Sequence, residues 1–445
     1  MIHLFTFKDL NIVTDTESGA VHVVSGTVYD MLSAAEHKKD RPFCVDASTQ
    51  REAKEEIEEL VREGLLFSEP VPEELVSPEL REPVIKAMCL HIAHDCNMRC
   101  AYCFAGTGEY SGERSLLPAE TGRNAIDFLL EHSGTRRNLE IDFFGGEPLM
   151  NFGVVRDLVR YGRERERELG KHIRFTLTTN GLLLDDENSA FINEHMDNVI
   201  LSIDGRPEVN DRVRRTVAGG GTYEHIIGKL RRFVKAREKA GKLYYVRGTY
   251  TAYNKDFAED VAHLASLGFG NVSVEPVVTS AEEDFALTEA DIPELCAEYD
   301  RLADLMIERE KSGAPLSFFH FNIDLSQGPC VFKRAAGCGA GTEYVAVAAN
   351  GDLYPCHQFV GEPAYLLGNV NAGNFENRLF DTFNTAHIFS KPACRDCWAK
   401  YWCSGGCHAN AVHMNGDILR PHELVCALER KRLECAIGLA ALAQM

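Results

Sequence analysis

The chain has 445 residues with a formal net charge of −20, and 45% of its residues are hydrophobic. This length suggests about three domains and can bury a large core, whereas the acidic balance disfavours nonspecific binding to nucleic acid or an anionic membrane surface. There is no run of about 20 apolar residues and no signal-peptide pattern at the N-terminus. We therefore expect a cytoplasmic protein with no nucleic-acid or membrane partner.

Residues 1–68 predict a small α+β unit. Short strands are expected over residues 2–7, 11–15 and 20–24. Helices are expected over residues 27–34 and 50–63, the second because Ala53, Ile57 and Leu60 recur at helical spacing. Three strands followed by helices suit a winged-helix-like module. The next segment, 69–84, contains four prolines and predicts a linker.

Strands and helices alternate from residue 85 to about residue 311. The expected strands are 85–92, 139–144, 173–179, 199–203, 244–250 and 271–278. The expected helices are 118–132, 152–169, 185–196, 222–240, 255–267 and 287–310. Six β/α repeats predict a parallel sheet, either doubly wound or a partial barrel, with ligands at the C-terminal ends of its strands.

Residues 312–445 are rich in cysteine and glycine, which indicates a region organised by metal. Asn350-Gly351 is a strong hairpin signal between strands expected over 343–348 and 352–355. A terminal helix is expected over 424–442.

The chain has 15 cysteines, three between residues 96 and 103 and eight between residues 330 and 426. In a reducing compartment, clustered cysteines bind metal more often than they form disulfides. The four that stand apart are expected to be buried free thiols: Cys44, Cys89, Cys296 and Cys435.

Cys96, Cys100 and Cys103 follow the first expected barrel strand in a C-x3-C-x2-C pattern. Three such cysteines can wrap one compact metal centre. A [4Fe–4S] cluster has four irons, so three thiolates leave one iron open to the amine and carboxylate of a small molecule. The alternative is a zinc site in which His94 completes the four ligands.

The triplet resembles the CxxxCxxC signature of radical S-adenosylmethionine (radical SAM) enzymes, with Tyr102 in the usual aromatic position. Gly145-Gly146-Glu147-Pro148, after the second expected strand, resembles the GGEP motif of the same family. We expect the two glycines to let the backbone approach the ligand closely. The resemblance implies that Glu147 accepts from the methionine ammonium.

Two further strand ends resemble family motifs: Thr179-Asn180-Gly181 and Ser202-Ile203-Asp204-Gly205. By that resemblance Asn180 and Ser202 contact S-adenosylmethionine, and Arg214 pairs with its carboxylate. The stretch leading to Arg214 begins with Asn210, where the family has His, so a solvated arginine is the alternative for Arg214.

The C-terminal cysteines resemble a SPASM domain, which carries two auxiliary [4Fe–4S] clusters and so implies three clusters in all. The resemblance assigns one set to the second auxiliary cluster: Cys394, Cys397, Cys403 and Cys426. It assigns Cys338, Cys356 and Cys407 to the first, where either Cys330 is the fourth ligand or an iron is open to a substrate thiolate. The alternative is structural zinc.

Two sequence segments resemble those of the maturases of six-cysteine SCIFF peptides: Gly328-Pro329-Cys330-Val331 and Pro355-Cys356-His357-Gln358. This implies thioether crosslinks in a ribosomal precursor peptide, with a leader bound by strand addition to the N-terminal module and flavodoxin or ferredoxin as electron donor. Sulfatase-maturating enzymes have an acidic base at the position of His357, so their reaction is disfavoured, and His357 becomes a candidate base. Carbon–carbon crosslinking, epimerisation and a non-enzymatic zinc scaffold stay open as alternatives.

The expected architecture is therefore an α/β chain built around a partial (β/α)6 radical SAM barrel. Its expected parts are a winged-helix-like peptide-recognition module (1–68), a linker (69–84), the barrel (85–311) and a cysteine-rich SPASM domain (312–445).

Overall fold

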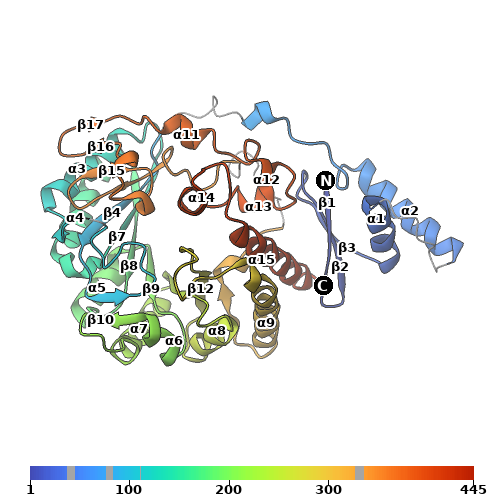
Figure 1. The fold of residues 1–445 in the computed structure, drawn as a ribbon, viewed down its shortest axis with the longest axis horizontal. Helices are drawn as coiled ribbons and strands as arrows, with labels where there is room; N and C mark the ends of the chain where they lie inside the picture. Colours follow the sequence, from blue (N-terminus) through green and yellow to red (C-terminus); the bar gives the residue numbers. More distant parts are fainter. Residues whose placement is uncertain (38–45, 77–83, 111, 326–334) are drawn as a thin grey trace.

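The computed structural model describes residues 1–37, 46–76, 84–110, 112–325 and 335–445. Cys330 and Cys44 lie outside the described residues. The long C-terminal helix α15 (Glu423–Leu442) lies between the partial barrel, on the left of Figure 1, and a small N-terminal sheet on the right, with α12 (Pro392–Arg395) and α13 (Lys400–Cys403) of the cysteine-rich region above it. No helix among the described residues is long and apolar enough to cross a membrane.

The N-terminal sheet is antiparallel in the order β1-β2-β3, as its strand pattern predicts. Its elements are β1 (Ile2–Phe7), β2 (Leu10–Asp15), β3 (Val21–Val24), α1 (Gly26–His37) and α2 (Ala47–Arg62). One face of the sheet packs on these two helices through Val13, Val28 and Leu32. The other face contributes Phe5 and Phe7 to the main core of the chain, so the unit is not merely tethered by a linker.

Six strands form the partial barrel, and all are parallel in the order β4-β7-β8-β9-β11-β12. They are β4 (Ala87–His94), β7 (Asn138–Gly145), β8 (His172–Thr179), β9 (Asn198–Ser202), β11 (Leu243–Tyr250) and β12 (Asn271–Pro276). Each matches an expected strand to within about two residues. The fold class predicted from the alternation is confirmed.

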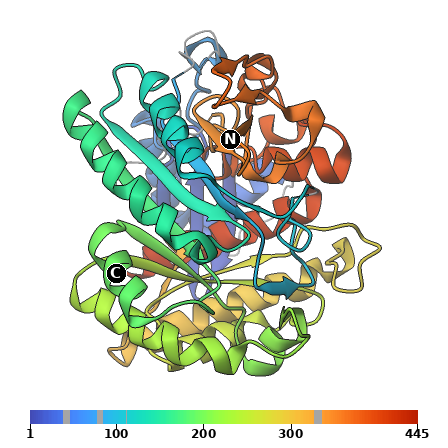
Figure 2. The same cartoon turned by 90° about the vertical axis from the view of Figure 1, so that its left-hand side faces the viewer.

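The six expected barrel helices are also present and cover the outside of the sheet (Figure 2). They are α3 (Ala119–Glu131), α4 (Phe152–Leu169), α5 (Asp186–His195), α7 (Tyr223–Lys239), α8 (Phe257–Ser266) and α9 (Ile292–Lys311). Local signals set their ends: Asp185 forms a capping box with Asn188 before α5, and Gly170 ends α4 in the left-handed conformation.

Three short elements around the cysteine triplet were not expected. They are β5 (Met98–Cys100), β10 (Arg214–Thr216) and α6 (Pro207–Val213). The antiparallel β5–β10 pair places Cys100 directly opposite Arg214. A two-stranded ribbon of three residues per strand has too little periodicity to be seen in the sequence.

The cysteine-rich region extends the barrel sheet. β14 (Tyr344–Val347) pairs in parallel with β4 and forms the predicted hairpin with β15 (Asp352–Tyr354). The remaining elements are β6 (Ser115–Leu116), β13 (Ser317–Phe318), β16 (Gly368–Asn369), β17 (Asn374–Phe375), α11 (Phe380–Asn384), α12 (Pro392–Arg395), α13 (Lys400–Cys403) and α14 (His408–Asn415). The β14–β4 pairing brings this region against the mouth of the barrel.

Candidate active site

A cavity of about 320 Å³ opens at the C-terminal ends of the barrel strands, where ligands bind in such folds. Its wall includes all three cysteines of the triplet and seven other residues singled out in the sequence: Tyr102, Gly145, Gly146, Glu147, Asn180, Ser202 and Arg214. His357 lies in the same wall. The fold thus gathers into one cavity residues that span more than half of the chain.

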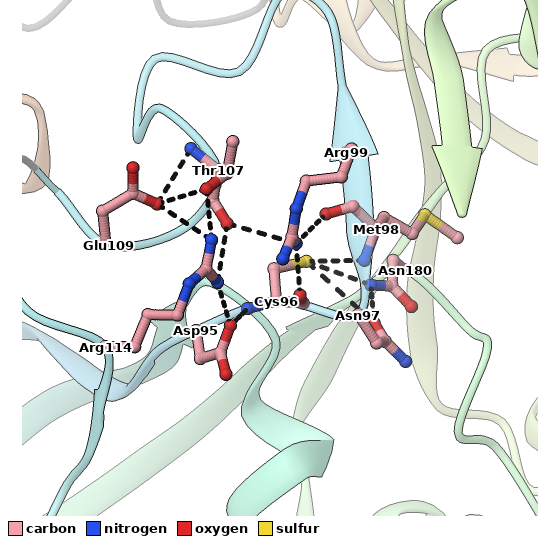
Figure 3. Close-up of polar contacts among 9 residues, drawn as sticks. All are labelled: Asp95, Cys96, Asn97, Met98, Arg99, Thr107, Glu109, Arg114 and Asn180. Carbon is pink, nitrogen blue, oxygen red and sulfur yellow. Dashed lines mark hydrogen bonds and ion pairs between the residues drawn. The ribbon is translucent and has the colours of Figure 1, made fainter. Parts of the chain in front are cut away.

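The loop that carries the triplet is held by arginines on its outer side (Figure 3). Arg99 donates to the carbonyl oxygens of Cys96 (2.6 Å) and Met98 (2.7 Å), and Arg114 pairs with Asp95. Burial raises the pKa of Cys96 and of Cys100 to about 11 and also raises the pKa of Cys103. Three thiols on one wall match the thiolate ligands of an iron–sulfur cluster, and binding to iron would deprotonate them.

The two glycines of the GGEP motif line the cavity and also permit close packing of the backbone. A Cβ atom at Gly145 would overlap the carbonyl oxygen of Ala93, and one at Gly146 would overlap that of Asp95. Gly145 also has φ 115°, which favours glycine. The two glycines therefore let the end of β7 pack against the backbone that leads into the cysteine triplet, and their close approach to the ligand stays a prediction.

Glu147 is buried, with 1% of its surface exposed. Its carboxylate already accepts from Leu149 N (3.0 Å), Thr179 Oγ1 (2.7 Å) and Asn180 N (2.8 Å). A carboxylate offers about four acceptor sites, so one is left for a ligand ammonium. Glu147 thus ties the end of β7 to the end of β8 as well as facing the cavity.

Arg214 is 5% exposed, so the alternative of a solvated arginine is wrong. Its Nη1 donates to the Tyr102 hydroxyl (3.1 Å) and its Nη2 to the Ser202 carbonyl oxygen (3.0 Å), while its Nε has no partner among the described residues. Tyr102 in turn donates to Asp204 (2.8 Å). Burial raises the pKa of Asp204 to about 6, against the effect of Arg214.

Asp204 was not among the residues expected to bind the ligand, although it lies in a motif that the sequence flagged. It belongs to the cavity wall, and its carboxylate also accepts from Thr249 N (3.1 Å). Asn180 lies on the inner side of the triplet, where its Nδ2 is 3.6 Å from Cys96 Sγ (Figure 3). Hydrogen bonds to ligating sulfurs tune the potential of an iron–sulfur cluster.

His357 reaches the cavity from the cysteine-rich region. Its Nδ1 is 3.2 Å from the Tyr344 hydroxyl, and its ring packs against Phe104 and Phe144 at centroid distances of 5.6 and 5.3 Å. Burial lowers the pKa of His357 to about 4. The imidazole is therefore neutral at pH 7, with a lone pair on one nitrogen.

The C-terminal cysteines fall into two groups. Four of them line a separate small cavity of about 40 Å³: Cys394, Cys397, Cys403 and Cys426. Cys338, Cys356 and Cys407 form the other group. Burial raises the pKa of Cys356, and the thiols of Cys407 and Cys338 are close enough to raise it further. Both groups match the sets expected from the sequence; Cys330, the remaining candidate, lies outside the described residues.

Among the residues that the structure describes, no three His, Cys, Asp or Glu side chains form a site for a single metal ion. Of the isolated cysteines, Cys89 and Cys435 are buried, as expected, whereas Cys296 is only partly so.

Two family models match the chain. The radical SAM superfamily model matches residues 90–267, and an iron–sulfur cluster-binding SPASM domain model matches residues 338–398. The chain therefore contains a radical SAM domain and a SPASM domain, and these matches support S-adenosylmethionine and iron–sulfur clusters as cofactors.

Relatives with known names fall among enzymes of this class. The serine-type anaerobic sulfatase-maturating enzyme of Bacteroides thetaiotaomicron is 26% identical over 370 residues, which span 72% of this chain and 82% of that protein. The AdoMet-dependent heme synthase of Nitratidesulfovibrio vulgaris is 24% identical over 385 residues, which span 79% of this chain and 94% of that protein. Two other curated matches are shorter, and the chain spans 42% of one and 32% of the other.

Solved structures share the fold. The structure of anSMEcpe with bound AdoMet and the Cp18Cys peptide has a TM-score of 0.64 at 19% identity, covering 81% of this chain and 99% of that one. Streptococcus suis SuiB bound to precursor peptide SuiA has a TM-score of 0.53 at 15% identity, covering 94% of this chain and 97% of that one.

Proposed function

We propose that this enzyme installs thioether crosslinks, from a cysteine sulfur to a carbon of another residue, in a ribosomally made cysteine-rich precursor peptide. The observation that carries the proposal is the single cavity that contains the cysteine triplet, the residues assigned to S-adenosylmethionine, and His357 from the cysteine-rich region. A wall built from both parts of the chain suits a reaction that needs a radical at one side and a thiol at the other.

When bound, S-adenosylmethionine and a reduced [4Fe–4S] cluster supply a 5′-deoxyadenosyl radical, which removes a hydrogen atom from carbon. We assign Cys96, Cys100 and Cys103 to hold this cluster. Arg214 is placed by Tyr102 and the Ser202 carbonyl to offer its unpartnered Nε to a carboxylate. The remaining acceptor site of Glu147 suits the ammonium, and Asn180 and Ser202 complete the polar wall.

Bond formation must also remove a proton and one electron, because a C–H and an S–H become a C–S bond while only one hydrogen atom leaves with the radical. His357 is neutral and faces the cavity, so we propose that it accepts the thiol proton. We assign Cys338, Cys356 and Cys407 to hold the acceptor of the electron. Cys330 either completes that site or leaves it open to the substrate thiolate.

The N-terminal sheet is the proposed leader-binding element, by strand addition to an edge. β3 is an end strand in the order β1-β2-β3, and Val23 on it is 44% exposed. The structure of SuiB with its precursor peptide supports a peptide substrate. A flavodoxin or ferredoxin is the proposed electron donor, and the proposal includes three [4Fe–4S] clusters.

Oxidation of a sulfatase residue is the second candidate, favoured by the likeness to sulfatase-maturating enzymes over 72% of this chain. His357 speaks against it, because such enzymes are expected to have an acidic residue at this position and this chain has a histidine.

The test is anaerobic incubation of the reconstituted enzyme with the cysteine-rich peptide encoded beside its gene, followed by thiol alkylation and tandem mass spectrometry. A thioether removes two hydrogen atoms and one alkylatable thiol for each crosslink. A carbon–carbon link removes the hydrogens but keeps the thiol, and epimerisation leaves the mass unchanged. Either of those results, or peptide that stays unmodified, would overturn the proposal. The control is the triple variant Cys96→Ala, Cys100→Ala, Cys103→Ala, which should form no 5′-deoxyadenosine.

A further inference from the structure

A second cavity, of about 220 Å³, adjoins the candidate active site. It lies between the end of β12 on one side and α14 and α15 on the other. Four residues line both cavities: Glu275, Pro276, Val278 and Asn410. The two cavities therefore meet at one junction, and the candidate active site continues toward the cysteine-rich region.

The second cavity also touches both groups of auxiliary cysteines. Its wall includes Cys407 of the first group and Cys403 and Cys426 of the second. A chain segment in this cavity would therefore run past the auxiliary thiols on its way to the cysteine triplet.

The charges in this region are already paired within the protein. Arg247 Nη2 lies 3.0 Å from Glu275 Oε1, and Arg432 Nη1 lies 3.3 Å from Glu429 Oε2. Each glutamate in the wall of the second cavity is thus paired with an arginine, so neither carboxylate is free to bind a cationic ligand. Together with apolar Pro276 and Val278, this favours a neutral chain of alternating donors and acceptors, which is the chemistry of a peptide main chain.

Asn410 stands at the junction and offers the matching groups. It lines both cavities, is half-buried, and its carboxamide makes no hydrogen bond with any side chain or backbone group in the part of the chain that the structure describes. A carboxamide presents one acceptor oxygen and an NH2 donor. It can therefore pair with both the N–H and the C=O of one residue in an extended peptide, because these two groups point to the same side of the chain.

Helix α15 connects this cavity to the N-terminal sheet. Val425 lines the cavity, and Gly438, thirteen residues later on the same helix, packs against Phe7 of β1. At about 1.5 Å of rise per residue these points are about 20 Å apart. An extended peptide covers that distance in about six residues.

We infer that the second cavity is the channel through which the substrate peptide enters the active site in extended form, with Asn410 binding the main-chain N–H and C=O of one of its residues. This inference rests on the proposed function, because it assigns a route to the peptide substrate. The distance along α15 from the N-terminal sheet to this cavity further requires at least about six residues between a leader bound on that sheet and the first modified residue.

Two variants test the channel in the reconstituted enzyme, with the adjacent precursor peptide as substrate. Asn410→Ala should raise the KM for the peptide about tenfold, the effect of losing one or two hydrogen bonds, with a smaller change in kcat. Val278→Trp should fill the junction and lower kcat/KM for the peptide by at least about a hundredfold. Val217→Trp is the matched control, because Val217 is 61% exposed and lies outside both cavities; its kinetics should equal those of the wild type.

A series of peptides with spacers of different length tests the channel on the wild-type enzyme, so that no enzyme variant has to fold. Peptides with the leader moved closer than about six residues to the first modified position should lose modification, and longer spacers should keep it. Wild-type kinetics in both channel variants, or full modification with a three-residue spacer, would overturn the channel alone. A wild-type enzyme that leaves every peptide unmodified would overturn the proposed function, and the channel with it.

Discussion

A buried ion pair joins the N-terminal sheet to the cysteine-rich region, and we expect that removing its glutamate, Glu17, releases the sheet. Lys400 Nζ lies 2.7 Å from Glu17 Oε1, with side chains 7% and 3% exposed, and the Tyr401 hydroxyl donates to Glu17 Oε2 at 2.9 Å. Glu17→Ala leaves a buried ammonium without its partner, which costs about 3–5 kcal/mol. The lost acceptor of Tyr401 adds about 1 kcal/mol.

Tryptophan fluorescence during anaerobic urea unfolding is a suitable assay. The chain has two tryptophans, and the ring of Trp398 stacks on His3 of β1 at 3.9 Å, so the emission should report release of the sheet. Glu17→Ala should move this transition to lower urea. The double variant Glu17→Gln, Lys400→Met removes both charges together and should cost clearly less than the sum of the single changes.

Glu55→Ala is the control, because its pair with Arg51 is 3.9 Å long and the two side chains are 68% and 72% exposed. Such pairs contribute about 0–1 kcal/mol. If Glu17→Ala unfolds within about 0.5 kcal/mol of this control, the reasoning about the buried pair is wrong.

Two further changes test individual residues of the barrel. Burial raises the pKa of Asp142 to about 7, above its value of about 3.9 in an unfolded chain. Ionisation of this carboxyl therefore lowers the free energy of unfolding as the pH rises from about 4 to 7. Asp142→Asn should therefore stabilise the protein relative to wild type by roughly 3 kcal/mol more at pH 8 than at pH 5; an equal effect at both pH values in urea unfolding would contradict this. Gly146→Ala should displace the carbonyl of Asp95 and lower S-adenosylmethionine cleavage at least about tenfold, measured as 5′-deoxyadenosine. Gly153→Ala, where a Cβ meets nothing within 4 Å, should keep wild-type cleavage, and equal activity in the two variants would count against the packing role of Gly146.

Much of the barrel was predictable because its signals are local. Each barrel strand and helix is long enough for its apolar residues to repeat with a clear period, as in β8 and α4. The cysteine triplet occupies eight consecutive residues, so its spacing is visible without a fold. The hairpin at Asn350-Gly351 was predictable for the same reason, since Gly351 adopts φ 93°.

Which distant elements lie next to one another could not be predicted, because this depends on pairings between residues far apart in the sequence. His357 reaches the barrel cavity because β14 pairs with β4, more than 250 residues earlier in the chain, and no local pattern encodes such a pairing. The pair between Glu17 and Lys400 and the packing of Phe7 on Gly438 likewise join the two ends of the chain. The sequence by itself therefore determined the long barrel strands and helices and which residue types can hold the cofactors. Only the tertiary structure decided which of them share one cavity, because burial and long-range strand pairing are properties of the packed chain and not of any segment.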